Sequence, residues 1–183
     1  MTRAESNHIG LAGRVATALR YLCLTAVLVG VVGVAGRLLF WPLLTSTVGP
    51  TAYVFAAHPQ SESARFRNAV VGHGVAIGTG VGALWAFGLI NHPSVSATGA
   101  PSLVQVAASA VAVGFTLFIL EILGSHHAPS AATALLISTG LARPGSPLIG
   151  LVLGLAIVLV LGPSCGRIPI ARATASRETV PMP

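Results

Sequence analysis

Charged residues are scarce in this chain of 183 residues, where Asp, Glu, Lys and Arg together make up 8%. An average soluble domain carries about 25% charged residues. Hydrophobic residues make up 54% of the chain, and the mean hydropathy is +0.84. This composition excludes an ordinary soluble domain and predicts a polytopic membrane protein in contact with the lipid bilayer.

Lysine is absent, and the net charge of +6 comes from ten arginines against four acidic residues. All the arginines but Arg37 lie near the termini or in the breaks between apolar runs, a distribution typical of topology signals and not of a nucleic-acid-binding surface. The chain has only two cysteines, Cys23 and Cys165, and neither has metal-ligand spacing. We therefore expect no nucleic acid partner, no disulfide-stapled fold and no metal or other cofactor.

Four apolar runs approach the roughly 20 residues that a helix needs to cross a bilayer. They cover residues 21–41, 69–90, 103–123 and 147–162. Two further apolar stretches, 42–57 and 128–141, are too short and too interrupted for ordinary spans. Such segments persist at membrane depth only where neighbouring helices bury them or water reaches them. The sequence predicts an all-α polytopic membrane protein with four long transmembrane helices and two short broken or re-entrant segments.

A single transmembrane domain is expected over residues 21–165. Residues 1–20 form a polar, cytoplasmic N-terminal segment whose weak apolar spacing suits a helix on the membrane surface. Residues 166–183 are expected to be a flexible cytoplasmic tail.

The uncharged linker 91–102 divides the domain into halves of about 21–90 and 102–165. When the halves are overlaid, Pro50 falls on Pro129, so the chain carries a weak internal repeat.

Arginine placement orients this repeat. Arginines near both termini belong in the cytoplasm by the positive-inside rule, which requires an even number of crossings. If the two short segments turn back, Arg65 and Arg67 lie outside; if they cross, both arginines return to the cytoplasm. We favour crossing, which gives an inverted repeat as in many transporters, in a cell membrane with both termini cytoplasmic.

Small residues recur every fourth position in the second apolar run. We expect close helix packing there and in the last run, because small side chains let helix backbones approach. The predicted packing positions are Gly74, Gly78, Gly82, Gly150 and Gly154, and Gly72, Ala76 and Gly80 form an adjacent stripe.

Each short segment contains a proline followed by a hydroxyl residue: Pro50-Thr51 and Pro129-Ser130. A proline that opens a helix leaves exposed amides and the positive end of the helix dipole beside it. Two such helix starts facing one cavity would suit a small anion. The alternative is that both prolines only kink packed helices.

Ionisable side chains within the membrane boundary usually face the protein interior or water. His73 can relay a proton, hydrogen-bond an anion or pack at an interface. Arg65 and Arg67 either recruit anions or set topology. Glu62 is expected to pair with Arg65 if its segment is helical, and Glu121 can contact the pair His126-His127.

The predicted substrate pathway draws on both short segments and the start of the second long helix. It comprises Pro50, Thr51, Arg65, Arg67, Asn68, His73, His127, Pro129, Ser130 and Thr133.

Several stretches resemble the signatures of the HPP family of integral membrane proteins. The first signature is matched by residues 42–49, 55–59 and 67–73, and the second by 127–136, where Ala128 replaces the first proline of the name-giving motif. The resemblance implies four membrane helices, no catalytic residues and, by analogy with plastid and cyanobacterial members, nitrite transport.

The favoured function is a channel or transporter for a small inorganic anion such as nitrite. A non-transporting structural or regulatory membrane subunit is the alternative. An intramembrane enzyme is not expected, because no Ser–His–Asp set, paired carboxylates or His-Glu-x-x-His spacing is present. Substrate identity, coupling, direction and assembly into a homo-oligomer stay open.

Overall fold

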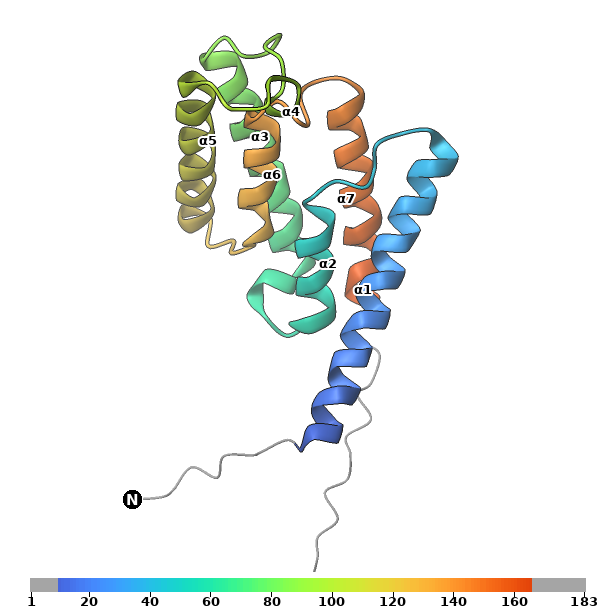
Figure 1. Cartoon of the computed structure of the whole chain (residues 1–183). Helices are drawn as coiled ribbons and strands as arrows, with labels where there is room; N and C mark the ends of the chain where they lie inside the picture. Colours follow the sequence, from blue (N-terminus) through green and yellow to red (C-terminus); the bar gives the residue numbers. More distant parts are fainter. Residues whose placement is uncertain (1–9, 166–183) are drawn as a thin grey trace, which may run out of the picture.

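The computed structural model describes residues 10–165, so the predicted tail 166–183 and the first nine residues lie outside the described part. Six helices form the body of the fold (Figure 1). They are α1 (Leu11–Leu39), α2 (Val48–Ala57), α3 (Phe66–Ala86), α5 (Leu103–Ile122), α6 (Pro129–Ser138) and α7 (Ser146–Cys165). A 3₁₀ turn, η1 (Glu62–Ala64), precedes α3, and a single turn, α4 (Val95–Thr98), lies in the linker.

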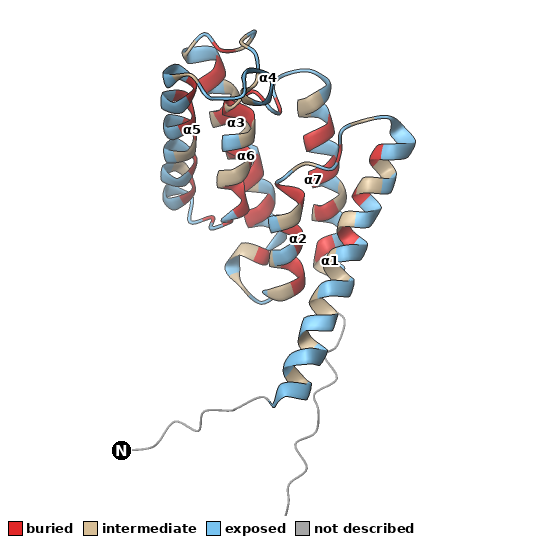
Figure 2. Cartoon of the chain, viewed as in Figure 1, coloured by how far each residue is buried: buried red, intermediate tan, exposed pale blue. Residues whose placement is uncertain are grey.

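Four of these helices are long and apolar enough to cross a membrane: α1, α3, α5 and α7. The two short helices, α2 and α6, have ten residues each and, at 1.5 Å per residue, reach about halfway through a bilayer. The predicted class of four long helices and two short ones is confirmed. Exposed residues cover the outer faces of these helices, and the buried ones lie where helices meet (Figure 2).

The first helix begins earlier than predicted. It starts at Leu11, inside the segment 1–20 that we expected to be separate from the first span, and runs unbroken for 29 residues. Its length is about 43 Å at 1.5 Å per residue, which exceeds the roughly 30 Å hydrocarbon core. Residues 11–20 therefore belong to α1 and do not form a separate helix, because good helix formers such as Leu11 and Leu19 extend α1.

Three chain segments meet beside the first third of α1. Arg20 Nη2 donates to the Cys165 carbonyl oxygen over 3.2 Å, and Tyr21 Oη donates to the Ala57 carbonyl oxygen over 3.3 Å. The ends of α7 and α2 therefore lie at the same end of the molecule as the start of α1. We call this the terminal end.

The linker marks the opposite end, which we call the linker end. There the Val95 amide donates to the Thr139 carbonyl oxygen over 3.1 Å, and Arg143 Nη1 donates to the His92 carbonyl oxygen over 3.4 Å. Residues 40–57 lead from the top of α1 back to the terminal end, and residues 124–139 lead from the terminal end to the linker end (Figure 1). Each short helix, together with the segment before it, thus runs from one end of the molecule to the other. Arg65 and Arg67 lie at the terminal end.

The six helices form two three-helix bundles. One contains α1, α2 and α7, and the other contains α5, α6 and α3. Helices α1, α2 and α3 run opposite to their counterparts α5, α6 and α7, respectively, so the two halves form an inverted repeat (Figure 1). The third helix of each half, α3 or α7, packs in the bundle of the other half.

Glycines make these exchanged contacts close. A Cβ at Gly72 would lie 2.9 Å from His127 Cβ, and one at Gly80 would lie 2.8 Å from Ile137 Cβ, at the two ends of α6. On α7, Gly154 faces the Leu43 backbone and Gly162 faces the Phe55 ring. Both helices therefore present glycines eight residues apart to the short helix of the other half and to the segment that leads into it.

The predicted stripe of Gly74, Gly78 and Gly82 was assigned to the wrong face of α3. All three are exposed, and a Cβ at any of them would meet nothing within 4 Å. The packed stripe contains Gly72, Ala76 and Gly80 instead. In α7, Gly150 lies against the Pro42 backbone, so both glycines predicted there pack closely, although against the segment that leads into α2 and not against a helix.

Candidate functional site

Two buried imidazoles lie where the two bundles meet near the terminal end. His73 enters this position from the second turn of α3, because its neighbours Gly72 and Ala76 let α6 approach that face. Its Nδ1 lies 2.9 Å from Thr133 Oγ1 of α6, and its Nε2 lies 3.2 Å from Thr51 Oγ1 of α2. His73 therefore connects the short helices of both halves.

His127 is the second imidazole, and it lies in the loop that leads into α6. Its Nε2 is 3.1 Å from His73 Nε2, and its Nδ1 is 2.6 Å from the Ser63 carbonyl oxygen. The two rings meet edge to face, with centroids 4.8 Å apart. Burial lowers the pKa of His127, and the hydrogen bond to Ser63 opposes that shift in part, so the ring is neutral at neutral pH.

The contacts fix the protons on both neutral rings. A carbonyl oxygen only accepts, so His127 carries its hydrogen on Nδ1 and presents a bare Nε2. His73 must then donate from Nε2, which leaves its Nδ1 to accept from the Thr133 hydroxyl. Thr51 donates to the Thr47 carbonyl oxygen over 2.8 Å, so its oxygen can share the His73 Nε2 hydrogen. Every group in this chain of contacts has a partner.

Ser130 is the exception at this site. Its side chain is fully buried, and Ser130 Oγ has no hydrogen-bond partner in the described structure. It lies beside Gly72, where any side chain would collide with it. A buried hydroxyl without a partner costs about 1–3 kcal/mol, so this oxygen is a candidate contact for a ligand.

The family model for the HPP transmembrane region matches residues 11–174. The chain belongs to the HPP transmembrane family. No curated protein and no solved structure shows significant similarity to this HPP chain. The family resemblance expected from the sequence is confirmed, and its four long helices agree with the structure.

The helix starts of the HPP chain differ from the predicted anion site. Pro129 does open α6, but the Ser130 amide already donates to the His127 carbonyl oxygen over 3.0 Å. Helix α2 begins at Val48, so Pro50 is its third residue and is exposed, and the Thr51 amide donates to the Thr47 carbonyl oxygen. The two prolines therefore do not present free amides to one cavity, and that part of the prediction is wrong. Side-chain hydroxyls and imidazoles fill the site instead.

The predicted arginines lie outside the buried cluster of the HPP chain. Arg65 is exposed and pairs with Glu62 over 3.5 Å, as the sequence predicted, and Arg67 is exposed on the first turn of α3. Asn68 is buried, but its amide caps the Glu62 carbonyl oxygen over 3.0 Å. These residues surround the terminal end of the site and do not enter it.

A cluster of ion pairs lies on the protein surface at the terminal end. His126 Nε2 is 3.1 Å from Glu121 Oε2, and His126 Nδ1 is 3.5 Å from Glu62 Oε2. These side chains are all more than half exposed, so the expected Glu–His contact forms through His126, on the surface. Among residues 10–165, no group of three or more His, Cys, Asp or Glu side chains is arranged to hold a metal ion.

The sequence interpretation missed a polar stripe along α5 of the HPP chain. Gln105, Ser109 and Thr116 are buried on one face. Gln105 Nε2 donates to the Pro93 carbonyl oxygen over 3.1 Å, while Ser109 and Thr116 bond to Ser138 of α6 and Thr79 of α3 over 3.0 and 2.6 Å. Spacings of four and seven residues place these side chains on one helix face, and that periodicity is visible in the sequence.

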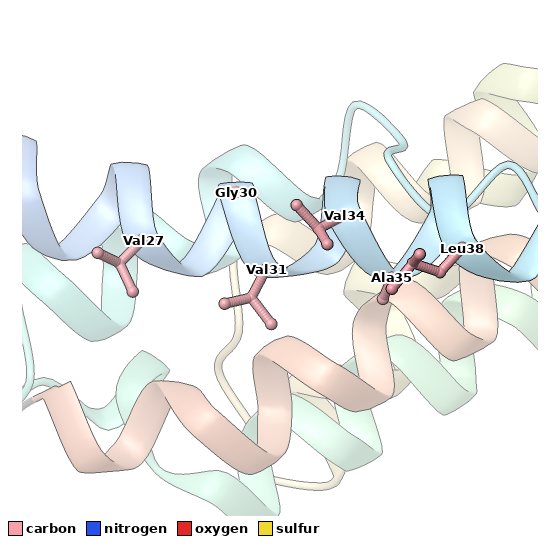
Figure 3. Close-up of a pocket in the computed structure, with 6 residues that line it drawn as sticks. All are labelled: Val27, Gly30, Val31, Val34, Ala35 and Leu38. Atoms are coloured by element: carbon pink, nitrogen blue, oxygen red, sulfur yellow. The ribbon is translucent and has the colours of Figure 1, made fainter.

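The HPP chain also has an apolar groove on α1, away from this cluster (Figure 3). Val27, Gly30, Val31, Val34, Ala35 and Leu38 line it. It offers no polar side chain to a ligand, and apolar helix faces of this kind suit contact with lipid. The groove is therefore not part of the functional site.

Proposed function

We propose that this HPP protein is a channel or transporter that carries a small inorganic anion, such as nitrite, through the junction of its two bundles. The observation that carries the proposal is the fully buried, unpartnered Ser130 hydroxyl beside two imidazoles and the Thr51 and Thr133 hydroxyls. A transported ion needs such uncommitted donors, since a hydroxyl already satisfied by the protein gains little from it.

The charge around the site favours an anion. The three ion pairs among the described residues all involve the exposed Glu62–His126 cluster, and none contains His73 or His127. Exposed Arg65 and Arg67 lie at the terminal end, where positive charge raises the local concentration of anions. A buried cation would instead require carboxylates or several carbonyl oxygens as ligands.

The close packing of the site limits the size of the substrate. Gly72 and Ser130 are in direct proximity, and His73 is held by three side chains. An ion of a few atoms fits this description better than an organic substrate. The proposal assigns the site transport and no catalytic step.

We also propose a cell membrane location with the terminal end in the cytoplasm. Arg14, Arg20, Arg65 and Arg67 lie on or next to that end, whereas Arg37 and Arg143 lie toward the linker end. The positive-inside rule then orients the protein. Labelling of cysteines at the two ends with an impermeant thiol reagent tests this orientation.

The function is tested by nitrite and nitrate uptake into vesicles that contain the purified protein. We expect Ser130→Ala to slow uptake by roughly tenfold, since a hydrogen bond to a charged ligand is worth about 1.5 kcal/mol or more. Thr51→Val should have the smaller effect, because the Thr51 hydroxyl hydrogen is engaged by Thr47.

The matched control is Thr98→Val, which removes an exposed hydroxyl at the linker end. Uptake equal to that of protein-free vesicles would contradict the proposal and favour a structural or regulatory subunit. Equal rates for Ser130→Ala and the control, at matched incorporation, would place the pathway elsewhere.

A further inference from the structure

The imidazole pair has a property that anion binding alone does not require. In the neutral pair, His73 Nδ1 carries no hydrogen, and its partner is the Thr133 hydroxyl oxygen, 2.9 Å away. This partner is a hydroxyl that can rotate and not an N–H group that can only donate. A hydroxyl can turn to accept as readily as it donates. A proton can therefore bind His73 Nδ1 while every heavy atom stays in place.

The resulting charge is shared by two rings. The contact of 3.1 Å between His73 Nε2 and His127 Nε2 joins an imidazolium to an imidazole, and the Ser63 carbonyl oxygen continues to accept from His127 Nδ1. A second proton would place two like charges at this distance, which strongly disfavours it. The neutral pair can thus take up at most one additional proton.

No fixed countercharge neutralises that proton within the described residues. The helices packed against the pair offer hydroxyls, from Thr51 on α2 and Thr133 on α6. The nearby titratable and charged groups are exposed and lie on η1, the first turn of α3, the end of α5 and the following loop: Glu62, Arg65, Arg67, Glu121 and His126. A buried charge without a partner is unfavourable, so a bound anion is the group that can balance it.

We propose that the His73–His127 pair takes up one proton with each anion, so that the protein is an electroneutral proton–anion symporter. This inference rests on the proposed function and adds its energy coupling. On loading, an N–H bond forms at His73 Nδ1 with a proton from the water on the side of entry, and the anion accepts from Ser130. On release, the anion leaves and the same N–H bond breaks, which returns the neutral pair.

The test uses nitrate as the probe, because nitric acid is a strong acid and its membrane-permeant neutral form is practically absent near neutral pH. Purified full-length protein is placed in vesicles of phosphatidylethanolamine and phosphatidylglycerol with an entrapped pH dye, and the voltage is set with potassium and valinomycin. An inward nitrate gradient should acidify the lumen by one proton for each nitrate. Nitrate accumulation should follow an imposed pH gradient and be insensitive to voltage.

The variants separate the pair from its surroundings. His127→Asn keeps an amide donor for the Ser63 carbonyl oxygen but removes the nitrogen that shares the proton, so nitrate-driven acidification should fall to the level of protein-free vesicles. His126→Asn is the matched control, since His126 is adjacent in sequence but exposed, and it should acidify like the unmodified protein.

The unmodified protein shows whether nitrate uptake is coupled to a proton, even if His127→Asn fails to fold. Nitrate uptake that follows voltage without acidification would overturn the symport and leave the proposed function standing. No uptake of nitrate or nitrite under any gradient would overturn both. Loss of acidification in His126→Asn equal to that in His127→Asn would show that the pair is not the proton site.

Discussion

The two bundles share a plan but differ in what they bury. The bundle of α1, α2 and α7 is held by apolar side chains such as Leu28, Val32 and Phe55. Of the twelve buried polar residues within 10–165, ten lie on α3, α5, α6 or the loop before α6, and the other two, Thr47 and Thr51, belong to the other bundle. One inverted repeat has therefore diverged into an anchoring bundle and a polar bundle that holds the candidate site.

The difference is clearest at the exchanged glycines. Gly154 lies against the Leu43 backbone, whereas the matching position on α3, Gly72, lies against the side chains of His127 and Ser130. A backbone contact fixes the spacing of two helices. A contact with polar side chains leaves groups that can rotate, which is what a binding site needs.

The first prediction concerns the inverted relation between the bundles, and its outcome is all or none. In a background of Cys23→Ser and Cys165→Ala, cysteines are placed at Gln60 and Ser96, which are exposed at the terminal and linker ends. An impermeant thiol reagent added to intact cells should label the Ser96→Cys variant and should label Gln60→Cys only after permeabilisation. Labelling of both from outside would break the crossing arrangement, and the reverse pattern would invert the orientation.

The second prediction compares the packing of the bundles. Gly154→Ala should lower the free energy of unfolding by about 3 kcal/mol, the upper part of the range for overpacking, because the Leu43 backbone must move. Gly72→Ala should cost less, about 1–2 kcal/mol, since the Ser130 side chain can turn away and only His127 Cβ, 2.9 Å from the added methyl, has to shift. Titration with a denaturing detergent measures both.

The control for these glycines is Gly78→Ala, on the open face of α3. It should be neutral or slightly stabilising, because alanine has the higher helix propensity. Destabilisation by Gly78→Ala equal to that by Gly154→Ala would show that an unseen partner covers this face.

The third prediction addresses the polar stripe and has the smallest expected effect. A double-mutant cycle on Thr79→Val and Thr116→Val should give a coupling energy of about 0.6 kcal/mol, the average for such pairs within membranes. The contact is short, at 2.6 Å between the two Oγ1 atoms. Zero coupling would show that α5 is held to α3 by the small residues around these threonines and not by the hydroxyl pair.

The long helices could be predicted because hydropathy alone defines them. The runs 103–123 and 147–162 correspond closely to α5 and α7. The beginning of α1 was missed because Arg14 and Arg20 interrupt the apolar pattern, although the local residues favour a helix.

The packing face of α3 and the site itself depended on tertiary structure. Glycines at 74, 78 and 82 and small residues at 72, 76 and 80 have the same spacing, and only the position of α6 decides which stripe is buried. His73, His127 and Thr133 were named from the sequence, but their partnership was not. The Ser63 carbonyl, which fixes the proton on His127, is a backbone group that no side-chain pattern reveals.

The exchange of third helices has a consequence for biosynthesis. All three helices of the polar bundle are synthesised before α7, so the His73–His127 pair can form while α2 still lacks one of its two helix partners. The last twenty described residues then close the anchoring bundle around α2. A chain released before residue 146 would therefore have its polar centre in place and one flank open to lipid or to chaperones of the insertion machinery.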